Sequence, residues 1–223
     1  PVVDINTNSK NPVIGLRSFG SDPKLVAQKA GMLLRGMQDG GLMTSIKHFP
    51  GHGNTSTDSH DMLPLVNHDI NHLNRIELYP FKTLIDEGVF SVMVGHLEVP
   101  TLEQTKGLPS SLSPSIIHDL LVKEFGFDGL VVTDALNMKG VSGYSGNQSS
   151  SLGSFLAGAD LLLIPDDLPI AFEDIRNAYV SGAITEERLA HSVKKILHAK
   201  FDAKLHESKL VLGDSLHQDI ESS

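Results

Sequence analysis

Five short apolar segments rich in β-branched residues recur along the chain, and segments with helical periodicity separate them. The pattern predicts five strands, within PVVDI (1–5), TSIKHF (44–49), FSVMVGH (90–96), LVVTDA (130–135) and DLLLIP (160–165). Near-continuous apolar strands that alternate with helices are typical of a parallel sheet covered on both faces. We therefore expect an α/β fold with about five parallel strands.

The intervening segments carry start and stop signals for helices. Asp22 and Pro23 form a cap and first-turn pair, and Gly40 and Gly41 end the apolar stripe that follows them. By the same reasoning further helices are expected over 114–125, over 73–87 with an interruption at Pro80, over 168–180, and after the capping residue Thr185. The stretch 149–151 is expected to be a short loop.

Composition narrows the classes of partner. The 223 residues carry a formal net charge of -9, which repels nucleic acid and anionic membrane surfaces. No apolar run approaches the roughly 18 to 20 residues of a membrane span. The absence of cysteine excludes disulfides and thiolate metal sites. We expect neither a nucleic-acid partner nor a membrane span, and the sequence leaves the cellular location open.

Titratable residues end three of the predicted strands: Lys47 and His48, then His96, then Asp134. The carboxyl ends of parallel strands open on one face, where ligands bind and chemistry takes place. Asp134 follows GLVVT and is expected to project its carboxylate from a rigid strand, as a nucleophile or a group that stabilises a cation. A structural role as a helix cap is the alternative for this residue.

The stretch KHFPGHGNTSTDSH (47–60) concentrates histidines after the second predicted strand. Pro50, Gly51 and Gly53 exclude a helix there. Asp58 and His60 are separated by one serine, so both side chains can point the same way and share a hydrogen bond that makes the imidazole a proton donor. Two alternatives stay open, namely a solvated loop without function and a metal site formed by His48, His52, Asp58 and His60.

Three motifs, KHFPGHGNTSTDSH, NPVIGLRSFG and GFDGLVVTDALNMKGV, resemble the β-N-acetylglucosaminidases of glycoside hydrolase family 3, of the NagZ type. The resemblance covers roughly residues 1–205. It implies a retaining exo-glycosidase on a TIM-like (β/α)8 barrel, with terminal GlcNAc of peptidoglycan fragments (muropeptides) as substrate and no cofactor. A sequence without tryptophan and with 5% aromatic residues fits a small pocket for one terminal sugar.

The resemblance also implies site residues. Asp134 corresponds to the nucleophile, and His60, oriented by Asp58, corresponds to the general acid/base. Arg17, Lys47 and His48 correspond to residues that bind the sugar hydroxyls and the N-acetyl group, with no metal. Because a neutral imidazole would not repel an anion, as a carboxylate base would by about 1 to 4 kcal/mol, we expect phosphorolysis beside hydrolysis.

Five strands are fewer than the eight of a complete barrel. The family's early strands and its Asp-Gln-Glu-Gly-Gly motif have no counterpart before Pro1, and Asn54 replaces the family's usual aspartate after GHG. The sequence therefore predicts a truncated barrel over 1–205, with a linker or tail over 206–223. The alternative functions are those of a metal-dependent hydrolase that uses the histidine loop (residues 47–60) and of a non-catalytic sugar-binding remnant.

Overall fold

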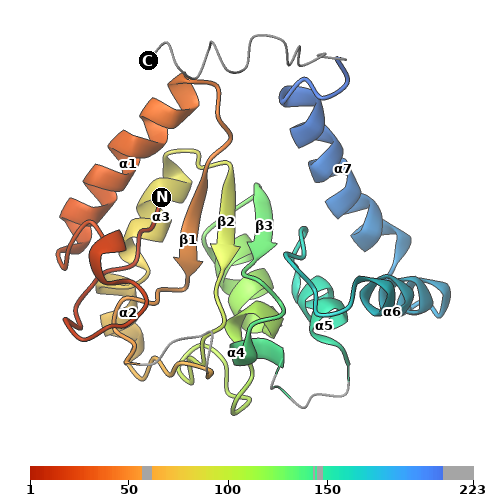
Figure 1. Ribbon diagram of the computed structural model, residues 1–223, viewed down its shortest axis with the longest axis horizontal. Coiled ribbons are helices and arrows are strands. Elements are labelled where there is room, and N and C mark those ends of the chain that lie inside the picture. The colour runs from red at the N-terminus through yellow and green to blue at the C-terminus, as the bar shows by residue number, and fades with distance from the viewer. Residues whose placement is uncertain (57–61, 143, 145–147, 208–223) are drawn as a thin grey trace, which may run out of the picture.

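A three-stranded parallel sheet forms the centre of the computed structural model, which describes residues 1–56, 62–142, 144 and 148–207 (Figure 1). The strands β1 (Ser45–Phe49), β2 (Ser91–Val94) and β3 (Leu130–Thr133) lie in that order. Ile46 pairs with Val92, and Val92 with Val131. The register shifts between Lys47 and Phe49, so the sheet is irregular at His48. Ile46, Val92 and Val131 are fully buried on one face, whereas Met93 and Val132 on the other face are half-buried, so the predicted coverage is complete on one face only.

The two outer predicted strands do not form as strands. PVVDI and DLLLIP each make one parallel bridge, from Val2 to Lys47 and from Leu161 to Val132, and so continue the sheet only by isolated contacts. Beyond Val2 the first segment contacts β1 through a side chain, because the Asp4 carboxylate accepts from the backbone N–H groups of His48 and His52. In the described part of the chain, the five-strand prediction is therefore wrong by two strands, although the order of the segments is as expected.

Helices surround the sheet, with α1 and α3 beside β1, and α6 and α7 beyond β3 (Figure 1). Their bounds are α1 Pro23–Asp39, α2 Ile70–Arg75, α3 Tyr79–Asp86, the π-helix η3 Ser115–Glu124, α4 Lys139–Ser142, α5 Ser150–Ala157, α6 Leu168–Val180 and α7 Glu186–Asp202, with short 3-10 turns η1 Gly15–Arg17 and η2 Ser110–Leu112. The caps predicted from sequence are confirmed: the Asp22 side chain accepts from Leu25 N, and the Thr185 side chain from Arg188 N.

Two predicted boundaries are wrong. The interruption expected at Pro80 lies earlier, between Arg75 and Tyr79, because proline in the first turn of α3 needs no N–H donor there. The stretch 149–151, expected to be a loop, opens α5, where the Ser149 side chain accepts from Leu152 N. Serine is a good N-cap, so this signal was present in the sequence.

Aromatic packing fixes β1 against the helices outside it. Phe49 is fully buried, and its ring meets those of Phe81 in α3 and Phe125 after η3, with centroid distances of 5.2 and 6.1 Å in edge-to-face geometry. These contacts hold the carboxyl end of β1, which carries Lys47 and His48, in a fixed position.

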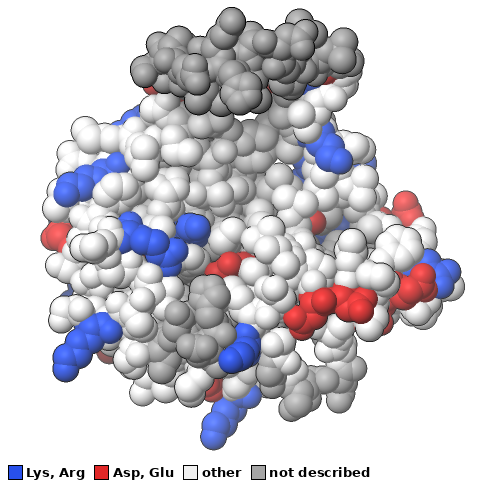
Figure 2. Space-filling view, in the orientation of Figure 1, with Lys and Arg blue, Asp and Glu red and all other residues white. Residues whose placement is uncertain are grey.

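The described helices include none long and apolar enough to cross a membrane. On the face shown in Figure 2, basic side chains lie in separate groups, and acidic side chains gather at the lower right.

Candidate active site

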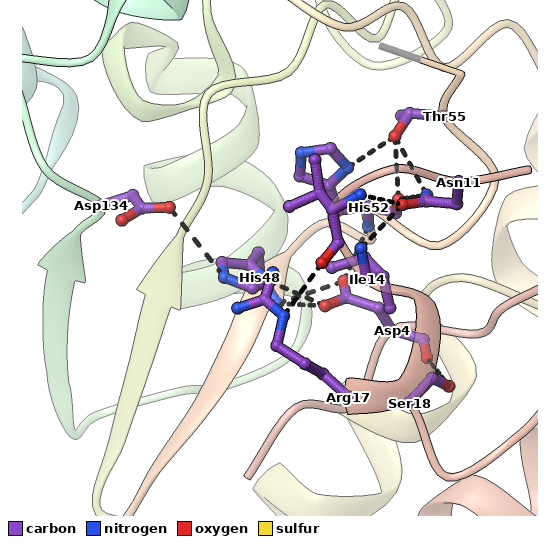
Figure 3. Close-up of polar contacts among 10 residues, drawn as sticks. Asp4, Asn11, Ile14, Arg17, Ser18, His48, His52, Thr55 and Asp134 are labelled. Atoms are coloured by element: carbon purple, nitrogen blue, oxygen red, sulfur yellow. Dashed lines mark hydrogen bonds and ion pairs between the residues drawn. The ribbon is translucent and has the colours of Figure 1, made fainter. Parts of the chain in front are cut away.

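Asp134 lies directly after β3, with its side chain 19% exposed. Its backbone N–H donates to the carbonyl of Val94 at 2.8 Å, and its Oδ1 accepts from the N–H of Ala135 at 2.8 Å. Oδ2 is 4.0 Å from Nε2 of His48, which ends β1 (Figure 3). The carboxylate is thus oriented by its neighbour's peptide group and directed across the end of the sheet.

His48 is held from behind by Asp4. The Nδ1–H of His48 donates to Asp4 Oδ2 at 2.8 Å, and its ring is nearly buried. The backbone N–H of His52 donates to Asp4 Oδ1 at 2.7 Å. Burial raises the pKa of the Asp4 carboxyl, but the positive charge of His48 and the hydrogen bonds from His48 and His52 outweigh burial and lower the pKa overall. Asp4 therefore fixes the ring so that Nε2 faces Asp134.

His96, at the end of β2, supports Asp134 from the other side. Its Nε2 lies 2.9 Å from the carbonyl of Ala135, which can only accept, so Nε2 carries the proton. Nδ1 then accepts from the Ser111 hydroxyl at 2.7 Å. Burial lowers the pKa of His96, partly offset by the bond to Ala135 and by the charge of Asp134. A neutral His96 thus fixes the Ala135 peptide that binds the Asp134 carboxylate.

The lowered pKa of His96 predicts an acid-sensitive fold. As the pH falls below about 6.5, the unfolded chain binds a proton on this residue before the folded chain does, so the free energy of unfolding decreases until the pH reaches the folded pKa. Urea unfolding between pH 7.5 and pH 5.5 should show the free energy of unfolding decreasing with falling pH, and this slope should be smaller in His96→Gln. His118→Gln, which removes an exposed histidine, is the control. An unchanged slope in His96→Gln would contradict the prediction.

The described part of the histidine loop is bound to the segment before η1. Asn11 Nδ2 donates to the carbonyl of His52 at 2.8 Å, and Asn11 Oδ1 accepts from Ile14 N at 2.7 Å. Asn8 Nδ2 donates to the carbonyl of Thr55 at 2.9 Å. As predicted, residues 50–56 contain no helix. Two segments far apart in sequence are thus joined beside His48 (Figure 3).

Gly53 allows the loop to approach the N-terminal segment. A β-carbon at Gly53 would lie 1.9 Å from the carbonyl oxygen of Ile5, which no ordinary contact permits. We expect Gly53→Ala to lower the free energy of unfolding by more than about 3 kcal/mol, because backbone has to shift. The matched control is Gly36→Ala on the exposed side of α1, where nothing lies within 4 Å, and alanine there should stabilise by about 0.5 to 1 kcal/mol. If chemical denaturation gave the same change in the free energy of unfolding for Gly53→Ala and Gly36→Ala, the prediction would be wrong.

The other predicted site residues differ in their exposure and in whether the structure describes them. Lys47 is half-buried in β1, where its backbone pairs with Pro1 and Val3. Arg17 is exposed at the end of η1, and its Nε donates to the carbonyl of Val13 at 3.0 Å. Asp58 and His60 lie outside the described residues, so their predicted pairing, and the loop metal site that requires them, stay predictions.

Comparison with known proteins decides the family. Residues 1–199 match the glycosyl hydrolase family 3 N-terminal domain. The chain belongs to glycosyl hydrolase family 3. It is 32% identical to beta-hexosaminidase A of Pseudoalteromonas piscicida, over 100% of this chain and 41% of that protein.

Solved structures of family 3 confirm the predicted fold class. The chain superposes on a β-N-acetylglucosaminidase from Paenibacillus sp. str. FPU-7 with a TM-score of 0.90 and 42% identity, over 95% of this chain and 40% of that one. The beta-glucoside phosphorylase BglX gives a TM-score of 0.88 and 30% identity, over 94% and 39%. The chain thus spans about two fifths of the length of these relatives, and its sheet with flanking helices is part of a TIM-like barrel.

Sequence reasoning missed two residues of this family 3 site, Asp4 and Asn11, whose hydrogen bonds orient His48 and the loop. His52 is predicted from sequence only as a possible metal ligand, whereas in the structure its backbone joins the loop to Asp4 and Asn11. One signal was available for Asp4, because it follows the pair Val2 and Val3 at the end of an apolar segment, much as Asp134 follows Val131, Val132 and Thr133. His96 had been noted only as a polar strand end, without its role in positioning Ala135.

Proposed function

We propose that this chain forms the catalytic part of a retaining β-N-acetylglucosaminidase that removes a terminal GlcNAc. The observation that carries the proposal is the Asp134 carboxylate, partly exposed at the end of β3 and 4.0 Å from the ring of His48. The substrate class is supported by two relatives, beta-hexosaminidase A of Pseudoalteromonas piscicida and the β-N-acetylglucosaminidase of Paenibacillus.

In the proposed reaction, an oxygen of Asp134 attacks the anomeric carbon as the bond to the leaving oxygen breaks. His60, oriented by Asp58, donates a proton to that oxygen. His60 then removes a proton from water, and the water oxygen displaces Asp134 from the anomeric carbon. Arg17, Lys47 and His48 bind the hydroxyls and the N-acetyl group, and peptidoglycan fragments are the proposed natural source of the sugar.

Covalent trapping tests the central step. The full-length protein is incubated with a 2-acetamido-5-fluoro sugar bearing a good leaving group, and its peptides are mapped by mass spectrometry. We expect one added sugar on Asp134, because the fluorine slows both steps by destabilising their cationic transition states, and the good leaving group restores the rate of the first step alone. A label on another residue, or turnover of a chromogenic β-GlcNAc substrate without any covalent species, would overturn the assignment.

Phosphorolysis is a second candidate activity. It is supported by the 30% identity to a structure described as a beta-glucoside phosphorylase and by the proposed neutral imidazole base, which does not repel phosphate. In high phosphate, GlcNAc 1-phosphate should appear beside free GlcNAc. If phosphate leaves the turnover unchanged and no sugar phosphate forms, the protein is a hydrolase only.

A chelation experiment separates these proposals from the metal-dependent alternative. If activity survives treatment with EDTA and elemental analysis finds no metal in the active sample, a hydrolytic metal in the histidine loop is excluded. A non-catalytic role would instead show as GlcNAc binding without turnover.

A further inference from the structure

Glu77 is a buried carboxyl group that the proposed reaction does not use. It lies between α2 and α3 with 1% of its side chain exposed, and neither of its oxygens has a hydrogen-bond partner among the described residues. Burying a carboxyl group without donors costs several kcal/mol, so such groups are normally paired or bind a cation.

Two histidines face this carboxyl group. His72 lies in α2, four residues after His68, and the two rings stack with a centroid distance of 4.0 Å. Nε2 of His72 is 3.4 Å from Oε1 of Glu77, longer than a normal hydrogen bond, and this nitrogen also has no hydrogen-bond partner among the described residues. Three potential ligand atoms, one from each residue, lie within 4.8 Å of one another.

These spacings suit a tetrahedral metal ion. Two ligands about 2.05 Å from a tetrahedral Zn²⁺ are about 3.3 Å apart, so the pair formed by His72 and Glu77 fits one edge of the tetrahedron without moving. His68 is half-exposed, and its ligand nitrogen lies within 4.8 Å of the ligand atoms of His72 and Glu77. Two imidazoles and one carboxylate are a ligand set that Zn²⁺ favours, with water in the fourth position.

We propose that His68, His72 and Glu77 form a binding site for a divalent transition-metal ion of the Zn²⁺ type, separate from the candidate active site. The site includes none of the residues assigned to sugar chemistry, and it does not depend on the glycosidase proposal. Binding would displace the protons held by the ligand atoms, so it should tighten as the pH rises.

The position of Glu77 suggests what the ion would do. A β-carbon on Gly51 would lie only 2.8 Å from Cβ of Glu77, so Glu77 packs directly behind the loop that follows β1. The carbonyl of His68 accepts from Thr101 Oγ1, which connects the same corner to the segment after β2. An ion bound here would join α2 to the support of the histidine loop and stabilise both.

Metal titration tests the site. The full-length protein is stripped with EDTA, desalted and titrated with Zn²⁺ by calorimetry, and Co²⁺ is used in parallel because a four-coordinate site gives an intense visible band. We expect one Zn²⁺ per chain, a rise in Tm on binding, and affinity at least about tenfold weaker (about 1.4 kcal/mol) in His72→Ala and in Glu77→Gln.

The controls separate this site from others. His72 is 29% exposed, so His72→Ala should fold, which an unchanged Tm in EDTA would verify, and His118→Ala should bind Zn²⁺ like the wild type. Lack of stoichiometric Zn²⁺ binding to the wild type would overturn the proposal. So would binding that His48→Ala abolishes and His72→Ala leaves intact, because the ion would then belong to the histidine loop.

Discussion

Replacing Asp134 with asparagine is expected to reduce kcat/KM for a chromogenic β-GlcNAc substrate by at least roughly 10³-fold, or about 4 kcal/mol of transition-state stabilisation. The amide is nearly the same size as the carboxylate and its oxygen can still accept from the N–H of Ala135, so the fold should persist. An amide is a far weaker nucleophile toward the anomeric carbon. The loss should therefore appear in kcat more than in KM.

The matched control for this substitution is Asp128→Asn. Asp128 is exposed before the amino end of β3, at the end of the strand opposite Asp134. Its replacement should leave kcat/KM unchanged, since chemistry in parallel α/β folds takes place at the carboxyl ends of the strands. If Asp134→Asn kept near wild-type activity, Asp134 could not be the nucleophile and the proposed mechanism would fail.

Replacing Asp4 with asparagine is expected to lower the free energy of unfolding by about 3 to 5 kcal/mol. Asp4 is fully buried and accepts hydrogen bonds from His48 Nδ1 and from the backbone N–H groups of His48 and His52. An asparagine NH₂ would face one of these donors and leave it unpaired. Urea unfolding at pH 7 measures the effect, and Asp22→Asn is the control because asparagine caps a helix as well as aspartate does.

Asp4 also predicts the direction of the pH dependence. Its pKa in the folded chain is lowered from an ordinary value of 3.8, so the stabilisation by the ionised carboxylate is complete above that pH and is lost as the pH falls through the folded pKa. Below pH 3.8 the wild type should lose stability more steeply than Asp4→Asn. If the free energy of unfolding of both proteins fell equally with pH, the stabilisation by Asp4 would not depend on its charge.

Local sequence signals were enough to predict the centre of the fold. Each of these signals determines structure within a few residues of itself. They are the apolar segments that form β1, β2 and β3 and the helix caps Asp22 and Thr185. The outer strands could not be predicted in this way. PVVDI meets β1 through one bridge at Val2 and through the Asp4 carboxylate, which accepts from the N–H of His48, a group 44 residues away that no local pattern can indicate.

The candidate site was predictable to a similar extent. The rule that parallel strands open on one face placed Asp134 and His48 together, and the structure puts them 4.0 Å apart. The rule says nothing about what orients each side chain. The hydrogen bonds that His48 donates to Asp4 and His96 donates to Ala135 join segments far apart in the chain, and no spacing in the sequence encodes them. The resemblance to the family assigned roles to Asp58 and His60, which lie outside the described residues.

The hydrogen bonds from Asn8 and Asn11 to the histidine loop have a consequence for protein engineering. A chimera that receives the loop of a relative, but keeps its own segment before η1, would present side-chain amides to carbonyls that no longer match them. Exchange of specificity between family members therefore requires transplanting both stretches as one unit, although some 40 residues of chain separate them.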